Sequence, residues 1–169
     1  MSVSMYDISI PGLSLGLTNL AAILNKAIVH AETKKFDSLS LAQARLFPDM
    51  FPLTRQVQIV CDTAKGAAGR LAGVAVPKHE DTETTLTELN ARVAKTLEFV
   101  NSFGAAQLVN SESREIVLQF PKSTLKFTGI DYLNKFVLPN FYFHISIVYA
   151  LLRKSGVEIG KNDYLGAIQ

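Results

Sequence analysis

The stretch TLTELNARVAKTLEFVNSFG, residues 85–104, predicts a helix more clearly than any other part of this sequence. Thr85 and Glu88 have the spacing of a capping box at a helix start, and Gly104 is a plausible end. We place the opening of this helix in residues 80–83. Its apolar residues recur at alternating spacings of three and four, the period of one helix face: Leu86, Leu89, Val93, Leu97, Val100 and Phe103.

Similar periodic segments predict three more long helices. One runs through residues 13–32, where apolar residues again recur at spacings of three and four. Another begins near Pro52 and ends at Gly73, because proline fits the first turn of a helix and glycine often follows the last. The last long helix is expected over residues 129–155, kinked or divided by Pro139 inside it.

The period changes between the third and fourth helices, which predicts strands. Ile116, Leu118 and Phe120 recur at every second position, and Leu125 and Phe127 do so again after a turn at residues 121–123. This pattern indicates a small β-hairpin. It should pack against the helices, because an isolated hairpin is only marginally stable in water.

Together these segments predict an all-α fold, an up-down-up-down four-helix bundle with a small β-hairpin between helices 3 and 4. Two shorter pieces complete it: residues 39–47, with one or two helical turns, and the polar tail GKNDYLG at residues 160–166. The chain has 169 residues, of which 48% are hydrophobic, enough for a sizeable core. We therefore predict a single domain over residues 1–169.

Charge, hydropathy and cysteine content limit the possible partners and the cellular location of the protein. The net charge is only +2 and Lys and Arg are thinly spread, so we expect no nucleic-acid partner. The most apolar stretch, residues 136–152, contains Pro139, Asn140 and His144, so we interpret it as a core helix and expect no membrane partner. A single cysteine, Cys61, precludes an intramolecular disulfide and suits a cytoplasmic protein.

His144 is the polar residue with the clearest potential for chemistry. It lies seven positions after Val137 and four before Val148, so a helix places it on the core-facing stripe, where bundles build metal and ligand sites. One interpretation is a core histidine satisfied by hydrogen bonds, and another is a general base. A third is a metal ligand, but such a site needs about three protein ligands. His30 flanks a helix stripe, and His79 lies in an expected exposed loop.

Four further polar residues are candidates for a ligand pocket around His144. Asp62 lies beside the core stripe of the second helix and has a carboxylate that could complete a site. Gln58 belongs to the polar first half of the same helix, which is also consistent with a solvated face. Tyr142 and Tyr149 lie near His144 on the last helix, where they either assist it or pack as core aromatics.

Several stretches carry a resemblance to a known family. They are RLFPDMFPLTRQVQ (45–58), DTAKGAAGRLAG (62–73), PNFYFH (139–144), YALLRKSGV (149–157) and GKNDYLG (160–166). The chain resembles an uncharacterised domain-of-unknown-function family, which is similar to the DinB/YfiT-like helical bundles. This resemblance implies their fold and frequent dimerisation. It also implies three histidines that hold a divalent metal such as zinc or nickel, in some members for thiol-transferase or related metal-dependent chemistry.

Carried over residue by residue, the metal motif is incomplete. His144 matches one of two histidines expected about one turn apart on the last helix, but the next turn offers Ile147 and Val148, which cannot bind a metal. The third histidine is expected early in the second helix, where this chain has Thr54, Gln56 and Gln58. We therefore assign no cofactor. A zinc or nickel ion held by His144 with other ligands is the alternative.

Two classes of function follow from these observations. The first is a non-catalytic or small-ligand-binding relative of the DinB-like proteins with a degenerate metal site. The second is a metal-dependent enzyme, of thiol-transferase or hydrolase type, that uses His144 in the bundle interior. We also expect a homodimer, because small residues near Gly66 and Gly69 would allow a neighbouring helix to approach closely.

Overall fold

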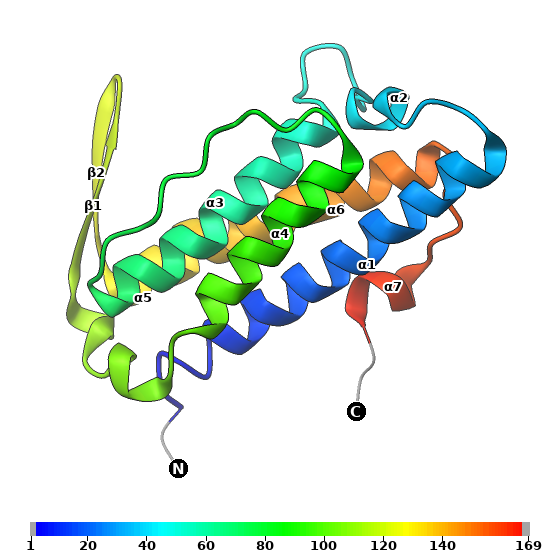
Figure 1. Cartoon of the computed structure of the whole chain (residues 1–169). Coiled ribbons are helices and arrows are strands. Elements are labelled where there is room, and N and C mark those ends of the chain that lie inside the picture. The colour runs from blue at the N-terminus through cyan, green and yellow to red at the C-terminus, as the bar shows by residue number, and fades with distance from the viewer. Residues whose placement is uncertain (1–2, 167–169) are drawn as a thin grey trace.

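Four long helices form the frame of the computed structural model, which describes residues 3–166 (Figure 1). They are α1 (Ile10–Lys34), α3 (Leu53–Ala72), α4 (Leu86–Asn101) and α6 (Leu138–Lys154). Helix α1 packs along α4, α4 along α3, and α3 along α6, while α1 also contacts α6. The apolar faces meet in one hydrophobic cluster. The predictions of a mostly helical protein and of a small sheet are both confirmed.

The ends of the two middle helices follow the sequence closely, with one correction. Glu88 N donates to Thr85 Oγ1 at 3.2 Å, and Thr85 N donates to Glu88 Oε2 at 3.0 Å, which is the predicted capping box. Gly73 ends α3 with a left-handed φ of 73°, which glycine adopts without strain. Helix α4 begins at Leu86 rather than in residues 80–83, because those residues bind side chains of α3 and α4 instead.

A short helix and a loop lead into α3. Helix α2 (Leu39–Ala42) supplies the predicted helical turn within residues 39–47. Thr54 Oγ1 donates to the carbonyl oxygen of Ala42 at 2.9 Å, and Leu53 N donates to that of Ala44 at 3.0 Å. These bonds hold the loop of residues 43–52 against the first turn of α3.

The predicted hairpin lies between α4 and α6, after two 3₁₀ turns, η1 (Ala105–Leu108) and η2 (Ser111–Ser113). Its strands are β1 (Glu115–Phe120) and β2 (Ser123–Thr128), paired antiparallel with Phe120 opposite Ser123. Ile116 and Leu118 are 3% and 5% exposed, so β1 turns its alternate apolar side chains inward as the pattern predicted.

The last long helical segment is divided just before Pro139. Helix α5 (Gly129–Asp131) leads into a π-helical turn, η3 (Tyr132–Val137), and then into α6. The irregularity therefore occupies the six residues before α6, while Pro139 takes the second position of a regular helix, where it is well tolerated. Asn140 Nδ2 donates to the carbonyl oxygen of Phe136 at 2.6 Å and satisfies an acceptor of the π turn.

The expectation of a polar tail at residues 160–166 is wrong. These residues form helix α7 (Lys161–Leu165), which packs on α1 (Figure 1). Asn19 Nδ2 donates to the carbonyl oxygen of Tyr164 at 3.0 Å, and Lys26 Nζ lies 2.6 Å from Asp163 Oδ1. Polar contacts with α1, absent from any local pattern, therefore anchor this segment.

The small-residue surface is covered within the chain. A Cβ atom at Gly66 would overlap Arg70 Nη1, and one at Gly69 would lie 2.8 Å from Val76 Cγ2. Both glycines are buried. The space beside them is filled by Arg70 and Val76 of the same chain and not by a second protomer. The homodimer stays a prediction, but this surface does not support it.

Two helical stretches, Ile10–Lys34 and Gly129–Lys154, are long and apolar enough to cross a membrane by length and composition alone. Core helices of soluble proteins have the same character. Leu13, Leu17 and Leu24 of α1 are 0% exposed, so this helix buries one apolar face in the core of the chain. The cytoplasmic location stays a prediction.

Candidate functional site

His144 and Gln56 meet where α6 packs against α3. The Nδ1 atom of His144 lies 2.6 Å from Oε1 of Gln56. Gln56 is only 2% exposed, while His144 is half-buried with the ring of Phe143 edge-on to it. His144 thus faces the α3–α6 contact, and its partner there is an amide.

The hydrogen bonds around Gln56 determine where the imidazole proton lies. Gln56 Nε2 donates to the carbonyl oxygen of Phe51 at 3.1 Å, so its Oε1 is the end that faces His144. Because Oε1 can only accept, Nδ1 carries the hydrogen and the ring lone pair lies on Nε2. Burial, and then the positive charge of Arg55, lower the pKa of His144 and favour this neutral ring.

These donors do not fit a resident zinc or nickel ion. Such a site needs about three protein ligands, drawn from imidazole, thiolate and carboxylate groups. Within residues 3–166, no three His, Cys, Asp or Glu side chains come together in a way that could hold a metal. One turn beyond His144, Ile147 and Val148 offer no donor atom, and the amide of Gln56 is engaged at both ends.

Gln58 takes part in a charged network beside the connection between α3 and α4. Its Nε2 donates to Glu83 Oε2 at 2.9 Å, and its Oε1 accepts from Arg55 Nη1 at 3.2 Å. Arg55 Nη1 is also 2.5 Å from Asp81 Oδ2. Gln58 therefore helps to hold the connection, and within residues 3–166 no hydrogen bond joins it to His144.

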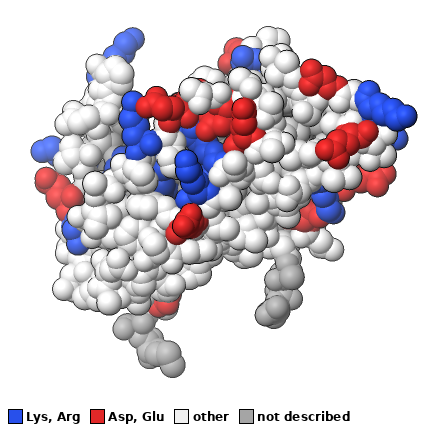
Figure 2. All heavy atoms as spheres, in the orientation of Figure 1, with Lys and Arg blue, Asp and Glu red and all other residues white. Residues whose placement is uncertain are grey.

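Asp62 belongs to the same network, through Arg92. Asp62 Oδ1 lies 2.9 Å from Arg92 Nη2 and 3.0 Å from Lys65 Nζ. Arg92 Nη1 in turn lies 3.0 Å from Asp81 Oδ1 and 3.1 Å from Glu83 Oε1. We call Arg92, Asp62, Lys65, Asp81 and Glu83 the Arg92 cluster. Figure 2 shows acidic and basic side chains interleaved over this face, where the α3–α4 connection crosses α3.

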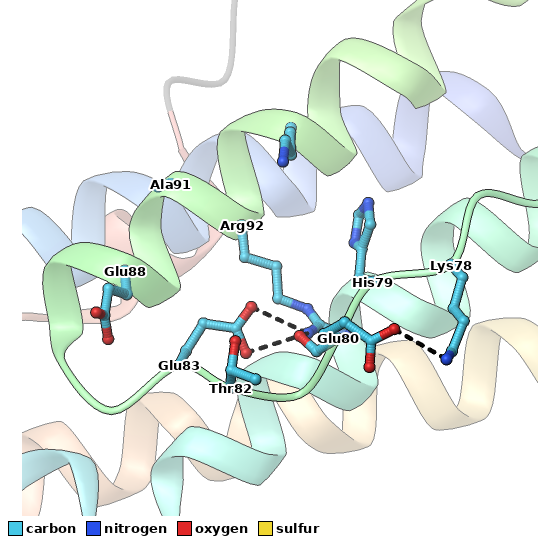
Figure 3. Close-up of a pocket in the computed structure, with 9 residues that line it drawn as sticks. Lys78, His79, Glu80, Thr82, Glu83, Glu88, Ala91 and Arg92 are labelled. Carbon is cyan, nitrogen blue, oxygen red and sulfur yellow. Dashed lines mark hydrogen bonds and ion pairs between the residues drawn. The ribbon is translucent and has the colours of Figure 1, made fainter.

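The Arg92 cluster attaches the α3–α4 connection to two helices. The Arg92 side chain is only 2% exposed and reaches from α4 toward Glu83 (Figure 3). A buried cation of this kind is tolerated only when carboxylates surround it. Burial raises the pKa of Glu83, but the hydrogen bonds from Gln58 and Arg92 outweigh it and lower that pKa overall. Glu83 therefore stays ionised and paired at neutral pH.

A surface cavity of about 450 Å³ opens beside this cluster. It is lined in part by His79 and Arg92 (Figure 3), and also by Lys95. His79 is half-buried, which corrects the expectation of an exposed loop residue. Its Nδ1 is buried and, among the described residues, has no hydrogen-bond partner. Burial, and then the charges of Lys65 and Arg92, lower the pKa of His79.

The two candidate tyrosines serve as packing groups at the surface of α6. Tyr142 is 42% exposed and meets Phe141 edge-on at 5.4 Å between ring centroids. Tyr149 is half-buried and packs edge-on against Tyr164 of α7 at 6.0 Å. No hydrogen bond joins either tyrosine to His144 within the described part of the chain.

Cys61 lies in the core and is 0% exposed. Burial raises the pKa of its thiol to about 12. A thiol that remains protonated and enclosed cannot act as a nucleophile at neutral pH. Cys61 is therefore a core residue.

A second cavity, of about 460 Å³, lies between the hairpin and α3, and the sequence motifs did not predict it. It is lined in part by Arg70, Tyr132 and Phe136. Arg70 follows the small residues of α3, and the two aromatic residues lie on the π turn η3. A cationic residue next to a run of glycine and alanine was the available indication, but it does not reveal which side chains lie opposite.

Four long helices, with a small antiparallel hairpin before the last of them and a histidine of that helix facing the start of α3, define a mostly helical protein with one two-stranded sheet. The chain belongs to the family described as a domain of unknown function, DUF1993, whose profile matches residues 5–165. The family resemblance drawn from the sequence motifs is thereby confirmed.

A solved structure supports the same assignment. A DinB family member protein from Shewanella denitrificans is 44% identical to this chain, with a TM-score of 0.87. The similarity covers 97% of this chain and 93% of that one. No curated protein matched the chain.

Proposed function

We propose that this protein is a non-catalytic, small-ligand-binding relative of the DinB-like proteins, in which a hydrogen bond occupies the position of a metal site. The Gln56–His144 bond carries this proposal. It joins the early part of α3 to α6, the two places where the family resemblance implies metal ligands. The Nδ1 hydrogen of His144 and the Oε1 atom of Gln56 satisfy each other, so neither side chain needs a metal ion as a partner.

The rest of the proposal concerns the framework. The four long helices are taken as a DinB/YfiT-like up-down-up-down four-helix bundle, which the sequence of helix contacts α1–α4–α3–α6–α1 supports. Ligand sites in such bundles form between elements, and this chain has cavities beside the Arg92 cluster and beneath the hairpin.

A homodimer is proposed from the family resemblance alone, and light scattering at micromolar concentration tests it.

Metal content is the deciding measurement. Untagged protein purified without chelator should contain far less than one zinc or nickel per chain, and the content should be the same in His144→Ala. Calorimetric titration with zinc and nickel should give no saturable site that depends on His144. Stoichiometric metal that disappears in His144→Ala would overturn the proposal.

An enzyme that uses His144 as a general base is the second candidate, and one observation favours it. The neutral ring has a free lone pair on Nε2, and its lowered pKa keeps it unprotonated near pH 7. This candidate requires a substrate beside Nε2. Small molecules retained during purification, identified by mass spectrometry and lost specifically in His144→Ala, would support it.

A further inference from the structure

The cavity beneath the hairpin combines one cationic residue with an aromatic wall. Arg70 of α3 forms part of its polar side, and Phe120 of β1 and Phe136 of η3 form part of its apolar side. Phe120, the last residue of β1, is 44% exposed, so its ring is accessible to a ligand in the cavity. A volume of about 460 Å³ lies within the range of small-molecule sites in proteins.

Arg70 is held in place at this cavity without a carboxylate partner. Its Nη1 donates to the hydroxyl oxygen of Tyr132 at 3.0 Å, and its guanidinium carbon lies 6.0 Å from the centre of the Tyr132 ring. The side chain occupies the space that a Cβ at Gly66 would fill. Within the described residues, no ion pair involves Arg70. Several of its five donors are therefore available to a ligand.

The π turn shapes the aromatic wall. Tyr132 and Phe136 lie at its first and fifth positions, and their rings stack at 5.9 Å with an angle of 16° between planes. The ring of Phe120 approaches that of Phe136 at 6.4 Å. π-Helical turns are rare and are frequent at functional sites. Here the turn sets two rings side by side, with the hydroxyl of Tyr132 at Arg70.

One acidic residue also lines this cavity, and its charge is already compensated. Asp62 Oδ1 lies 3.0 Å from Lys65 Nζ and 2.9 Å from Arg92 Nη2. An anion at Arg70 would therefore not face an unpaired carboxylate. The free positive charge of the cavity is that of Arg70.

We propose that this cavity binds a small apolar carboxylic acid, with its carboxylate on Arg70 and its hydrocarbon body against Phe120 and Phe136. Arginine offers parallel donors that match the two oxygens of a carboxylate, and such charge-assisted bonds are the stronger kind. The aromatic wall prefers an apolar body over a free inorganic anion. This inference rests on the proposed small-ligand binding and names its site and ligand class.

The test uses 2-naphthoate as the probe and the uncharged 2-naphthamide as its matched analogue. Calorimetry and amide NMR shifts on the full chain should show saturable binding of one naphthoate, with shifts confined to the hairpin, η3 and the second half of α3. The amide should bind at least about tenfold more weakly, because it lacks the charge that Arg70 recognises. No saturable binding at about 1 mM naphthoate, or equal binding of both probes, would overturn the inference.

Protein variants separate the site from non-specific adsorption. Arg70→Gln should weaken naphthoate binding at least about tenfold. Arg153→Gln, which removes an exposed arginine at the far end of α6, should leave it unchanged. Gly66→Ala should also weaken binding by displacing the guanidinium, which requires no loss of fold because a flexible side-chain end moves. Equal affinity in the wild type and Arg70→Gln would reject the site. Equal affinity would not change the metal content measured for the wild type and His144→Ala. Failure of this inference can therefore be told apart from failure of the proposed function.

Discussion

Gln56 and His144 stand 88 positions apart in the sequence and are joined by a hydrogen bond of 2.6 Å. The amide is itself anchored to the carbonyl oxygen of Phe51, so it offers His144 an acceptor of fixed position. A metal at Nδ1 would require the loss of the very proton that this bond uses. The pair therefore stabilises the contact between α3 and α6 with neutral groups, where a metal site would need charge and further ligands.

Removing one member of the pair should cost more than removing both. His144→Phe leaves the buried Oε1 of Gln56 without a donor, which should lower the free energy of unfolding by about 1–3 kcal/mol. Gln56→Leu should cost a similar amount because it leaves Nδ1 of His144 without an acceptor. The double variant should recover about 0.5–3 kcal/mol relative to the sum of the singles. Urea unfolding measures the cycle, and strictly additive losses would show that the bond contributes nothing.

Restoring histidines should create a metal site at this place. Gln56→His combined with Ile147→His, or with Val148→His, would bring two added imidazoles to within about one turn of His144. With three imidazoles, zinc or nickel should raise the melting temperature at concentrations that leave the wild type unchanged. Gln56→His alone is the control and should show a smaller shift. If metal stabilises neither double variant, the side chains at positions 56, 144 and 147 or 148 do not point to a common site, contrary to what the Gln56–His144 contact indicates.

Acid should destabilise the protein through His144 and His79. Both histidines have a pKa below the ordinary value of 6.5, chiefly because of burial. As the pH falls below 6.5, the unfolded chain binds protons that the folded chain does not, so stability decreases until the folded pKa values are passed. Glu83 adds its loss only below its ordinary pKa of 4.5. Unfolding free energies between about pH 7 and 5 should fall less steeply in His144→Gln and in His79→Gln than in wild type. An unchanged slope in both would contradict the prediction, and His30→Gln is the control.

Sequence periodicity predicted the long helices because each buries one continuous face. The stripe from Leu86 to Phe103 identified α4 because α-helical spacing repeats without interruption there. The π turn at Tyr132–Val137 was missed, since one extra residue per turn leaves no compositional mark. Helix α7 was missed because Asn19 and Lys26, far away in the sequence, hold it in place. Local patterns do not contain such contacts.

The candidate site was only partly predictable for the same reason. His144 was recognisable because it interrupts an apolar stripe, but Gln58 and Asp62 were grouped with it although they belong to another face of α3. Arg92 was overlooked despite a usable indication. It lies three positions after Leu89, on the side of α4 that is buried, where an arginine needs carboxylate partners.

Loss of Arg92 should release the connection between α3 and α4. Arg92→Ala would leave Asp62, Asp81 and Glu83 without their shared cation, and removal of one partner of a buried pair typically costs 3–5 kcal/mol. We expect the lower end, about 3 kcal/mol, because Asp62 and Asp81 are 39% and 43% exposed and are partly screened by water.

Hydrogen exchange distinguishes release of this connection from general destabilisation. Amides of residues 74–85 should exchange faster in Arg92→Ala, beyond the change expected from global stability, while those of the α1–α7 contact should follow global stability alone. Lys95→Ala, which removes an exposed cation one turn away, should change neither quantity appreciably. Uniform acceleration across all helices would mean that Arg92 supports the core as a whole. Selective acceleration would show that its carboxylate partners hold this connection in place.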